Sequence, residues 1–262
     1  MSSPPPRPAP EVVIGGMRMT TASRRGLVDQ FVADANERRS SRVRTRPKVV
    51  VDANGHALSL YASDTGYRAA VDAADLVHAD GGFLITASRW LTDRPIHERS
   101  ATTDLIHDFA AAAASHGLGF YLYGATEAIN ADCAAVLAKR YPGLRIVGRH
   151  HGYTDDLDSV ADDIVRTGPD VVWVGLGKPR EQVAALALRE RVDAAWIVTC
   201  GGCFNFVTGA YRRAPAWMQR TNLEWVHRLA TQPRKLFWRY LVTTPHALYL
   251  TLTRTQRNAV RG

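Results

Sequence analysis

The sequence lacks an apolar run long enough to cross a membrane. Its most apolar late stretch, residues 236–252, is interrupted by Arg239, Pro245 and His246, whereas a spanning helix needs ~20 uninterrupted apolar residues. The first ten residues, MSSPPPRPAP, contain no apolar segment of the kind found in a signal peptide. We therefore expect a cytoplasmic protein that does not cross the membrane.

Cysteine is scarce, with three residues in 262. An odd number of cysteines does not make a disulfide framework, which agrees with a cytoplasmic location. The spacing of Cys200-Gly-Gly-Cys203 resembles that of redox and zinc motifs, but one pair without a second is weak evidence for zinc. A thioredoxin-like role is the alternative to the interpretation we favour, in which small residues fill the end of a strand.

Complete phosphate-binding and metal-binding motifs are also missing. The sequence contains no full G-x-G-x-x-G and no P-loop string. Asp156-Leu-Asp158 resembles the Asp-x-Asp pair with which many sugar transferases bind a divalent metal. Both aspartates lie where a helix is expected to begin, so capping explains them better. We expect no metal and no other cofactor.

The C-terminal fifth of the chain has almost no acidic residues. Residues 211–262 contain ten Lys or Arg and one acid, Glu224, whereas the rest of the chain is close to neutral. This basic segment indicates an anionic partner, either a membrane or a nucleic acid. Trp217, Trp225 and Trp238 lie in it, and they suit a lipid headgroup layer as well as stacking on single-stranded bases. A solvated helical surface is the third interpretation that composition leaves open.

The central part of the sequence alternates between two patterns. Six continuous apolar runs, each ending near Gly, Asn or Asp, are separated by amphipathic segments of helical period. This order predicts a doubly wound, mostly parallel α/β sheet of Rossmann-like type. The runs are KVVVDANG, ADLVHADGG, GFYLYGAT, RIVGRHHG, DVVWVGLG and AWIVTCGG, and the helices are expected at 65–74, 103–116, 127–140, 158–166 and 180–191.

Three parts follow from this pattern. Residues 1–46 are rich in Pro and Arg and predict a flexible leader with one helix around 24–37. Residues 47–210 form the α/β domain. Residues 211–262, with breaks at Pro215 and Pro233 and no strand-like run, predict a basic helical appendage.

Polar or glycine-rich clusters follow five of the predicted strands. Ligands bind at the carboxyl ends of parallel strands, where glycine allows a phosphate to approach the backbone. Together these clusters predict a cleft of the nucleotide-binding type. Asp80, at the end of an apolar run and before two glycines, is our candidate for a general base; an aspartate that caps the next turn is the alternative. The candidate binding residues are Asn54, Gly81, Gly124, His151, Tyr153, Gly175 and Gly177.

These strings, in this order, resemble the WecG/TagA/CpsF family of bacterial glycosyltransferases over about residues 49–242. The matching pieces are ADLVHADGG, the His-Glu-Arg99 block, HHGY, VGLGKPREQ and the segment that begins GGCFNF. The last is the most specific, because Gly-Gly-x-Phe is followed by Arg-Ala-Pro, Leu-Glu-Trp and Arg-Leu at family spacing.

The resemblance implies an inverting, metal-independent transferase that moves an N-acetylmannosamine-type or related sugar from a UDP-sugar. The acceptor would be a sugar on a polyprenyl diphosphate, used for surface or wall polymers. Asp80 would be the base and Arg99 a second catalytic residue, and the remaining binding residues would be Pro179, Arg180, Glu181, Gln182, Arg228, Arg234 and Arg239.

The expected partners follow from the same resemblance. They are the UDP-sugar, the lipid-linked acceptor and the anionic inner face of the cell membrane, and a homo-oligomer is compatible with the sequence. We expect no nucleic-acid partner; the alternative is a nucleotide-binding protein that holds single strands with its basic tail. Asp52, Glu181-Gln182 and Asn205 depart from the residues usual in the family, which suggests a different donor sugar or reduced activity.

Overall fold

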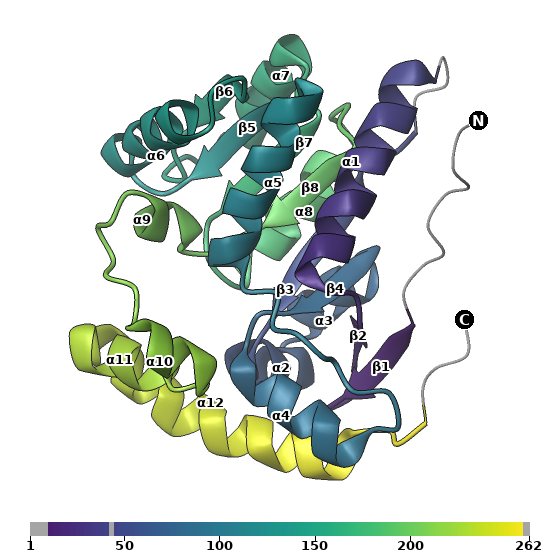
Figure 1. Cartoon of the computed structure of the whole chain (residues 1–262), viewed down its shortest axis with the longest axis vertical. Helices are drawn as coiled ribbons and strands as arrows, with labels where there is room; N and C mark the ends of the chain where they lie inside the picture. Colours follow the sequence, from purple (N-terminus) through teal and green to yellow (C-terminus); the bar gives the residue numbers. More distant parts are fainter. Residues whose placement is uncertain (1–9, 42–44, 259–262) are drawn as a thin grey trace.

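The computed structural model describes residues 10–41 and 45–258. At its centre lies a parallel sheet with the strand order β4-β3-β8-β7-β5-β6 (Figure 1). Every one of its strands falls within one of the predicted apolar runs, so the α/β prediction is confirmed. The strands are β3 (Lys48–Ala53), β4 (Leu76–Ala79), β5 (Gly119–Gly124), β6 (Arg145–His150), β7 (Val171–Gly175) and β8 (Trp196–Thr199).

Helices cover both faces of the sheet because most of the strands are apolar on both sides. Trp173 and Trp196, from neighbouring strands, are almost completely buried. On one face lie α1 (Arg24–Ser40), α5 (Thr102–His116), α6 (Glu127–Arg140) and α9 (Cys203–Val207). On the other lie α2 (Gly55–Ser63), α3 (Thr65–Asp72), α4 (Gly82–Leu91), α7 (Leu157–Thr167) and α8 (Arg180–Arg189).

The prediction of a flexible leader is wrong for residues 10–41. Two short antiparallel strands, β1 (Glu11–Ile14) and β2 (Met17–Thr20), form a hairpin whose Ile14 and Met17 are fully buried. The predicted helix is confirmed as α1, whose first turn is capped by the hydroxyl of Ser23. Strands of four residues are too short to show a clear alternation. The first nine residues lie outside the described part of the chain.

Three helices that follow strand ends, α2, α4 and α9, were not predicted. The helix α2 begins directly after β3, where the side chain of Asn54 accepts a hydrogen bond from the backbone N–H of Ala57 at 3.1 Å. The helix α4 begins after Asp80-Gly81. For α2 and α4, the Asn and Gly residues at the strand ends were assigned to a binding cleft, although an Asn or a Gly can also stand at the N-cap of a helix.

The segment after residue 210 is helical, as predicted, but it is not separate from the body. It contains α10 (Ala216–Arg220), α11 (Glu224–Thr231) and α12 (Pro233–Arg254). The last lies along α2 (Figure 1) and buries Leu236, Ala247 and Leu250. His246 Nδ1 is 2.9 Å from Ser59 Oγ. Among the described residues, no helix is both long and apolar enough to cross a membrane.

Candidate active site

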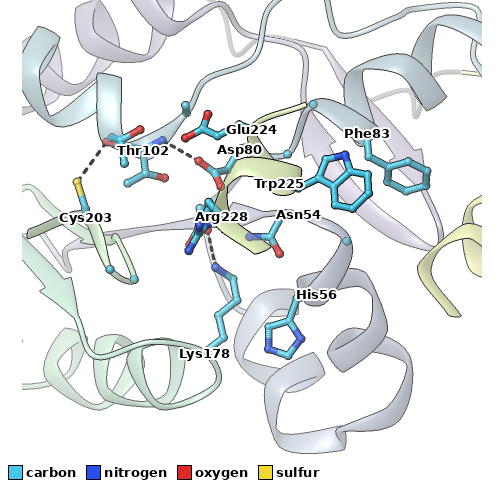
Figure 2. A pocket seen from close by; sticks show the side chains of 18 of the residues that line it. Asn54, His56, Asp80, Phe83, Thr102, Lys178, Cys203, Glu224, Trp225 and Arg228 are labelled. Atoms are coloured by element: carbon cyan, nitrogen blue, oxygen red, sulfur yellow. Dashed lines mark hydrogen bonds and ion pairs between the residues drawn. The ribbon is translucent and has the colours of Figure 1, made fainter. Parts of the chain in front are cut away.

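A pocket of about 630 Å³ lies at the carboxyl ends of β4, β3, β8 and β7. It is a cleft at strand ends of the kind that the sequence predicts. The helices α11, seen in Figure 2 with Trp225 and Arg228, and α12 also line the pocket, so the basic segment and the α/β domain share one site. Lining residues include Asn54, His56, Asp80, Gly81, Arg99, Gly177, Lys178 and Glu181 from the body and Glu224, Trp225, Arg228, Arg239 and Tyr240 from the helices.

Asp80 stands directly after β4 and lines this pocket. Its Oδ1 accepts a hydrogen bond from the backbone N–H of Thr102 at 2.9 Å (Figure 2). Burial by itself would raise the pKa of this carboxyl group, but the Thr102 N–H and the positive charges of Lys178 and Arg99 hold it below its usual value of 3.8. Asp80 is therefore a carboxylate at neutral pH and has a free oxygen for a proton.

A buried lysine between two carboxylates forms the floor of the pocket. Lys178 Nζ forms an ion pair with Asp52 and lies 3.7 Å from Glu181 Oε1. Glu181 Oε2 accepts hydrogen bonds from the backbone N–H of Gly177 and of Gly201, at 3.0 and 2.7 Å. Asp52 and Glu181 are two positions at which the sequence departs from the family pattern. Their side chains thus both contact Lys178.

The charges of this floor depend on one another. Burial would lower the pKa of Lys178, but Asp52 and Glu181 raise it above its usual value, so the ammonium keeps its charge. Burial raises the pKa of Glu181 to about 6 despite the nearby Lys178. Burial likewise raises the pKa of Asp52. Removing any one of the three charges would leave the others uncompensated in a low-dielectric site.

Two arginines of the C-terminal helices turn into the pocket from the opposite side. The guanidinium of Arg228 lies 5.5 Å from the ring centre of Phe206, and that of Arg239 lies 5.4 Å from the ring centre of Tyr240. Both Nε atoms are buried and have no hydrogen-bond partner among the described residues. Burial lowers the pKa of Arg239, and the charge of Arg228 adds to the effect. Donors of this kind suit an anion with several oxygens, such as a diphosphate.

An ion-pair chain joins these helices to the body. Arg99 donates to Glu224 at 2.9 Å, and Glu224 also lies 3.4 Å from Arg213. Arg213 in turn contacts Asp104 on α5 at 2.7 Å. Glu224, the single acid of the basic segment, thus holds α11 next to Arg99, a candidate catalytic residue.

The structure brings half of the sequence-predicted residues together. Those that line the pocket are Asn54, Asp80, Gly81, Arg99, Gly177, Glu181, Arg228 and Arg239, and those that do not are Gly124, His151, Tyr153, Gly175, Pro179, Arg180, Gln182 and Arg234. Arg180, Arg234 and Tyr153 are exposed. The prediction that Arg234 is a binding residue is therefore wrong for this pocket, whereas Arg228 and Arg239, predicted with it, do line the pocket.

The other residues outside the pocket have structural explanations. Gly124 has φ 142°, and a Cβ there would lie 2.3 Å from the Gly175 carbonyl oxygen, so this glycine permits close packing of strand ends. His151 Nδ1 accepts a hydrogen bond from the backbone N–H of Tyr153 at 3.2 Å. Gln182 is buried and donates to Glu181 at 3.2 Å. Pro179 stands at the N-cap of α8.

Several pocket residues were not predicted. His56 follows the Asn54-Gly pair, and Lys178 stands inside the GLGKPR string. Their positions in the sequence, next to predicted binding residues, could have indicated that they line the pocket. Burial lowers the pKa of His56 to about 4, and the charges of Arg239 and Lys178 act in the same direction, so its ring is neutral at pH 7.

The cysteine and aspartate motifs carry no separate chemistry here. Cys200 and Cys203 are buried and not disulfide-bonded, and burial raises the pKa of both thiols well above the usual value, which makes them poor nucleophiles. Asp156 caps α7 by accepting from the Ser159 N–H, and Asp158 pairs with Arg191. Within residues 10–41 and 45–258, no cluster of three or more His, Cys, Asp or Glu side chains could hold a metal.

Known proteins resemble this chain across its length. The model of the "Glycosyl transferase WecG/TagA/CpsF family" matches residues 12–261. A protein of Bacillus spizizenii is 32% identical over 179 residues, which is 68% of both chains. One from Bacillus subtilis strain 168 is 30% identical over 74% of this chain and 75% of its own. One from Staphylococcus aureus strain MRSA252 is 26% identical over 68% and 70%.

The three relatives carry one name, N-acetylglucosaminyldiphosphoundecaprenol N-acetyl-beta-D-mannosaminyltransferase. None of these matches supports the alternative of a single-strand-binding protein. The family match also agrees with the geometry, in which a carboxylate and two arginines with unsatisfied buried Nε atoms line one cleft. The chain is a glycosyltransferase and belongs to the WecG/TagA/CpsF family.

Proposed function

We propose that this enzyme transfers an N-acetylmannosamine-type sugar from a UDP donor to N-acetylglucosamine on a polyprenyl diphosphate. The observation that carries the proposal is the ionised Asp80 in the same pocket as Arg228 and Arg239, whose buried Nε atoms have no hydrogen-bond partner among the described residues. The names of the relatives support the acceptor and the β-configured product. The product would enter a surface or wall polymer.

The transfer step follows from the placement of these groups. Asp80 takes the proton of an acceptor hydroxyl as that oxygen bonds to the anomeric carbon of the donor sugar. The bond from this carbon to the phosphate oxygen breaks, and UDP leaves with its electron pair. Arg228 and Arg239 stabilise the charge that develops on the diphosphate. With an α-linked donor, attack from the opposite side inverts the anomeric centre and gives a β product.

The exposed side of α12 supports a peripheral position on the membrane. Seven large apolar side chains of this helix are at least 48% exposed, and at 100° per residue they fall within one stripe. Exposed apolar residues beside arginines suit an anionic headgroup layer. We propose attachment to the inner face, with the rest of the protein in the cytoplasm; a homo-oligomer stays a prediction. The side chains are Phe237, Trp238, Leu241, Val242, Leu248, Tyr249 and Leu252.

Replacing Arg239 with alanine should weaken the binding of UDP by roughly tenfold or more, because a charged hydrogen bond is worth ~1.5–3 kcal/mol. Arg234→Ala on the same helix is the matched control, since its side chain is exposed and outside the pocket. Calorimetric titration with UDP measures the affinity of both variants for UDP. Equal affinities for wild type and Arg239→Ala would remove this arginine from the diphosphate site.

We propose that no metal takes part, so transfer should continue in the presence of EDTA. Without a metal, arginines must neutralise the leaving diphosphate, and the pocket provides them. Turnover of the purified enzyme, measured before and after chelation, checks this. Loss of activity that Mg²⁺ or Mn²⁺ restores would show that the diphosphate needs a metal.

A further inference from the structure

The helix α4 has an apolar edge that packing does not explain. Phe83 is 38% exposed and Trp90 83%, the highest value among the large apolar side chains of the described residues. The two lie seven residues apart, which is two helical turns, so they share one side of the helix. Leu84 and Ile85 bury the other side in the core. The helix thus presents its largest side chain to solvent.

One end of this edge lies at the pocket. Phe83 lines it together with Trp225 of α11, and both lie on the same side of the pocket in Figure 2. Gly82 is packed so closely against the turn before α11 that a Cβ there would lie 2.1 Å from Asn222 Oδ1. The N-terminus of α4 and the start of α11 therefore border the pocket side by side.

The other end of the edge reaches the end of α12. The backbone N–H of Asp93, just after α4, donates to the carbonyl of Arg257 at 2.8 Å. Arg257 Nε also lies 3.3 Å from Asp93 Oδ1. Leu248 and Leu252, in the C-terminal half of α12, are exposed. The residues that follow α4 and those that follow α12 thus lie side by side at the ends of these two helices.

The charges around this edge are mainly positive. Four arginines on α4, on the segment after it and at the end of α12 are exposed, against two exposed acids, Asp93 and Glu98, and Asp93 is paired with Arg257. Arginines on the same segments as an exposed tryptophan match an anionic headgroup layer, where the indole lies at the boundary between headgroups and acyl chains. The arginines are Arg89, Arg94, Arg254 and Arg257.

We propose that α4 is a second membrane-binding element and that the Phe83–Trp90 edge lies in the headgroup layer of an anionic bilayer. The side of the pocket that Phe83 and Trp225 line would then face the membrane. A lipid-linked acceptor reaches Asp80 from this side without leaving the bilayer, with its apolar chain beside Phe83 and Trp225. The identity of the acceptor rests on the proposed function; membrane contact by α4 does not.

The substitution Trp90→Ser tests the proposal, because an exposed residue can be replaced without disturbing the core. Sedimentation with phosphatidylglycerol-containing vesicles should show an affinity at least about tenfold lower, since burying a large apolar side chain is worth roughly that much or more. Val183→Ser on α8 is the matched control, because Val183 is 54% exposed and lies outside the pocket. Equal vesicle affinity for Trp90→Ser and wild type would overturn the proposal.

Transfer rates with two kinds of acceptor distinguish a failure of this proposal from a failure of the proposed function. Trp90→Ser should transfer to a water-soluble, short-chain acceptor at the wild-type rate but act more slowly on an acceptor embedded in vesicles. An equal loss on both acceptors would mean that Trp90 acts on the pocket, which contradicts a membrane role. If wild type used neither acceptor, the proposed function would fail, while the vesicle affinities would still decide the role of α4.

Discussion

Replacing Asp80 with asparagine is expected to lower turnover by about 10²–10⁴-fold, the usual contribution of a positioned base. Asparagine keeps an oxygen that can accept from the Thr102 N–H, which holds Asp80 at 2.9 Å, so the fold and the binding of UDP should persist. It cannot take a proton from the acceptor. Steady-state transfer rates, with UDP titration and thermal unfolding of the same samples, measure the three properties.

The control for this variant is Asp162→Asn on α7, an exposed carboxylate that does not line the pocket. It should transfer at the wild-type rate. Turnover of Asp80→Asn within a few-fold of wild type, with the fold intact, would mean that the base is another group.

The second large effect concerns stability. Lys178→Met should lower the free energy of unfolding by about 3–5 kcal/mol, because it leaves Asp52 and Glu181 as unpaired buried charges. Urea unfolding at pH 8 measures the loss. The triple variant Asp52→Asn, Lys178→Met, Glu181→Gln removes all three charges and should recover most of it. A single variant as stable as wild type would show that the three charges are not coupled.

The loss in Lys178→Met should also depend on pH. Burial already raises the pKa of Glu181 to about 6 with the lysine present, and the pKa of both carboxyls must rise further without it. A carboxyl whose pKa is higher in the folded than in the unfolded state favours folding at low pH and loses this contribution as the pH rises through the folded value. The difference from wild type should therefore be smaller at pH 5 than at pH 8.

The strand-end clusters show how far the sequence could predict the site. The clusters after β3, β4 and β7 do meet at the pocket, whereas those after β5 and β6 do not. The reason is the strand order, in which β5 and β6 occupy the far edge of the sheet. Apolar runs indicate which segments are strands, but the order of the strands depends on long-range packing that no local pattern records.

The C-terminal helices show a second limit. The amino-acid composition indicates that residues 211–262 are basic and bind an anionic partner. It does not show which of their arginines face the pocket. That depends on how α12 is rotated against α2, which the buried Leu236, Ala247 and Leu250 set. With this rotation Arg239 lines the pocket and Arg234 is exposed. Both arginines were predicted to bind, and the rotation of the helix decides that only Arg239 of the two faces the pocket.

The most direct test of the central claim is mass spectrometry of the lipid product. The purified enzyme is incubated with UDP-N-acetylmannosamine and a polyprenyl-diphosphate-linked N-acetylglucosamine, with Asp80→Asn in parallel. We expect the lipid to gain the mass of one N-acetylhexosamine residue as an equal amount of UDP is released, with at most a trace of product in the variant. A lipid of unchanged mass after UDP release, or equal product with both proteins, would contradict transfer by Asp80 in this pocket.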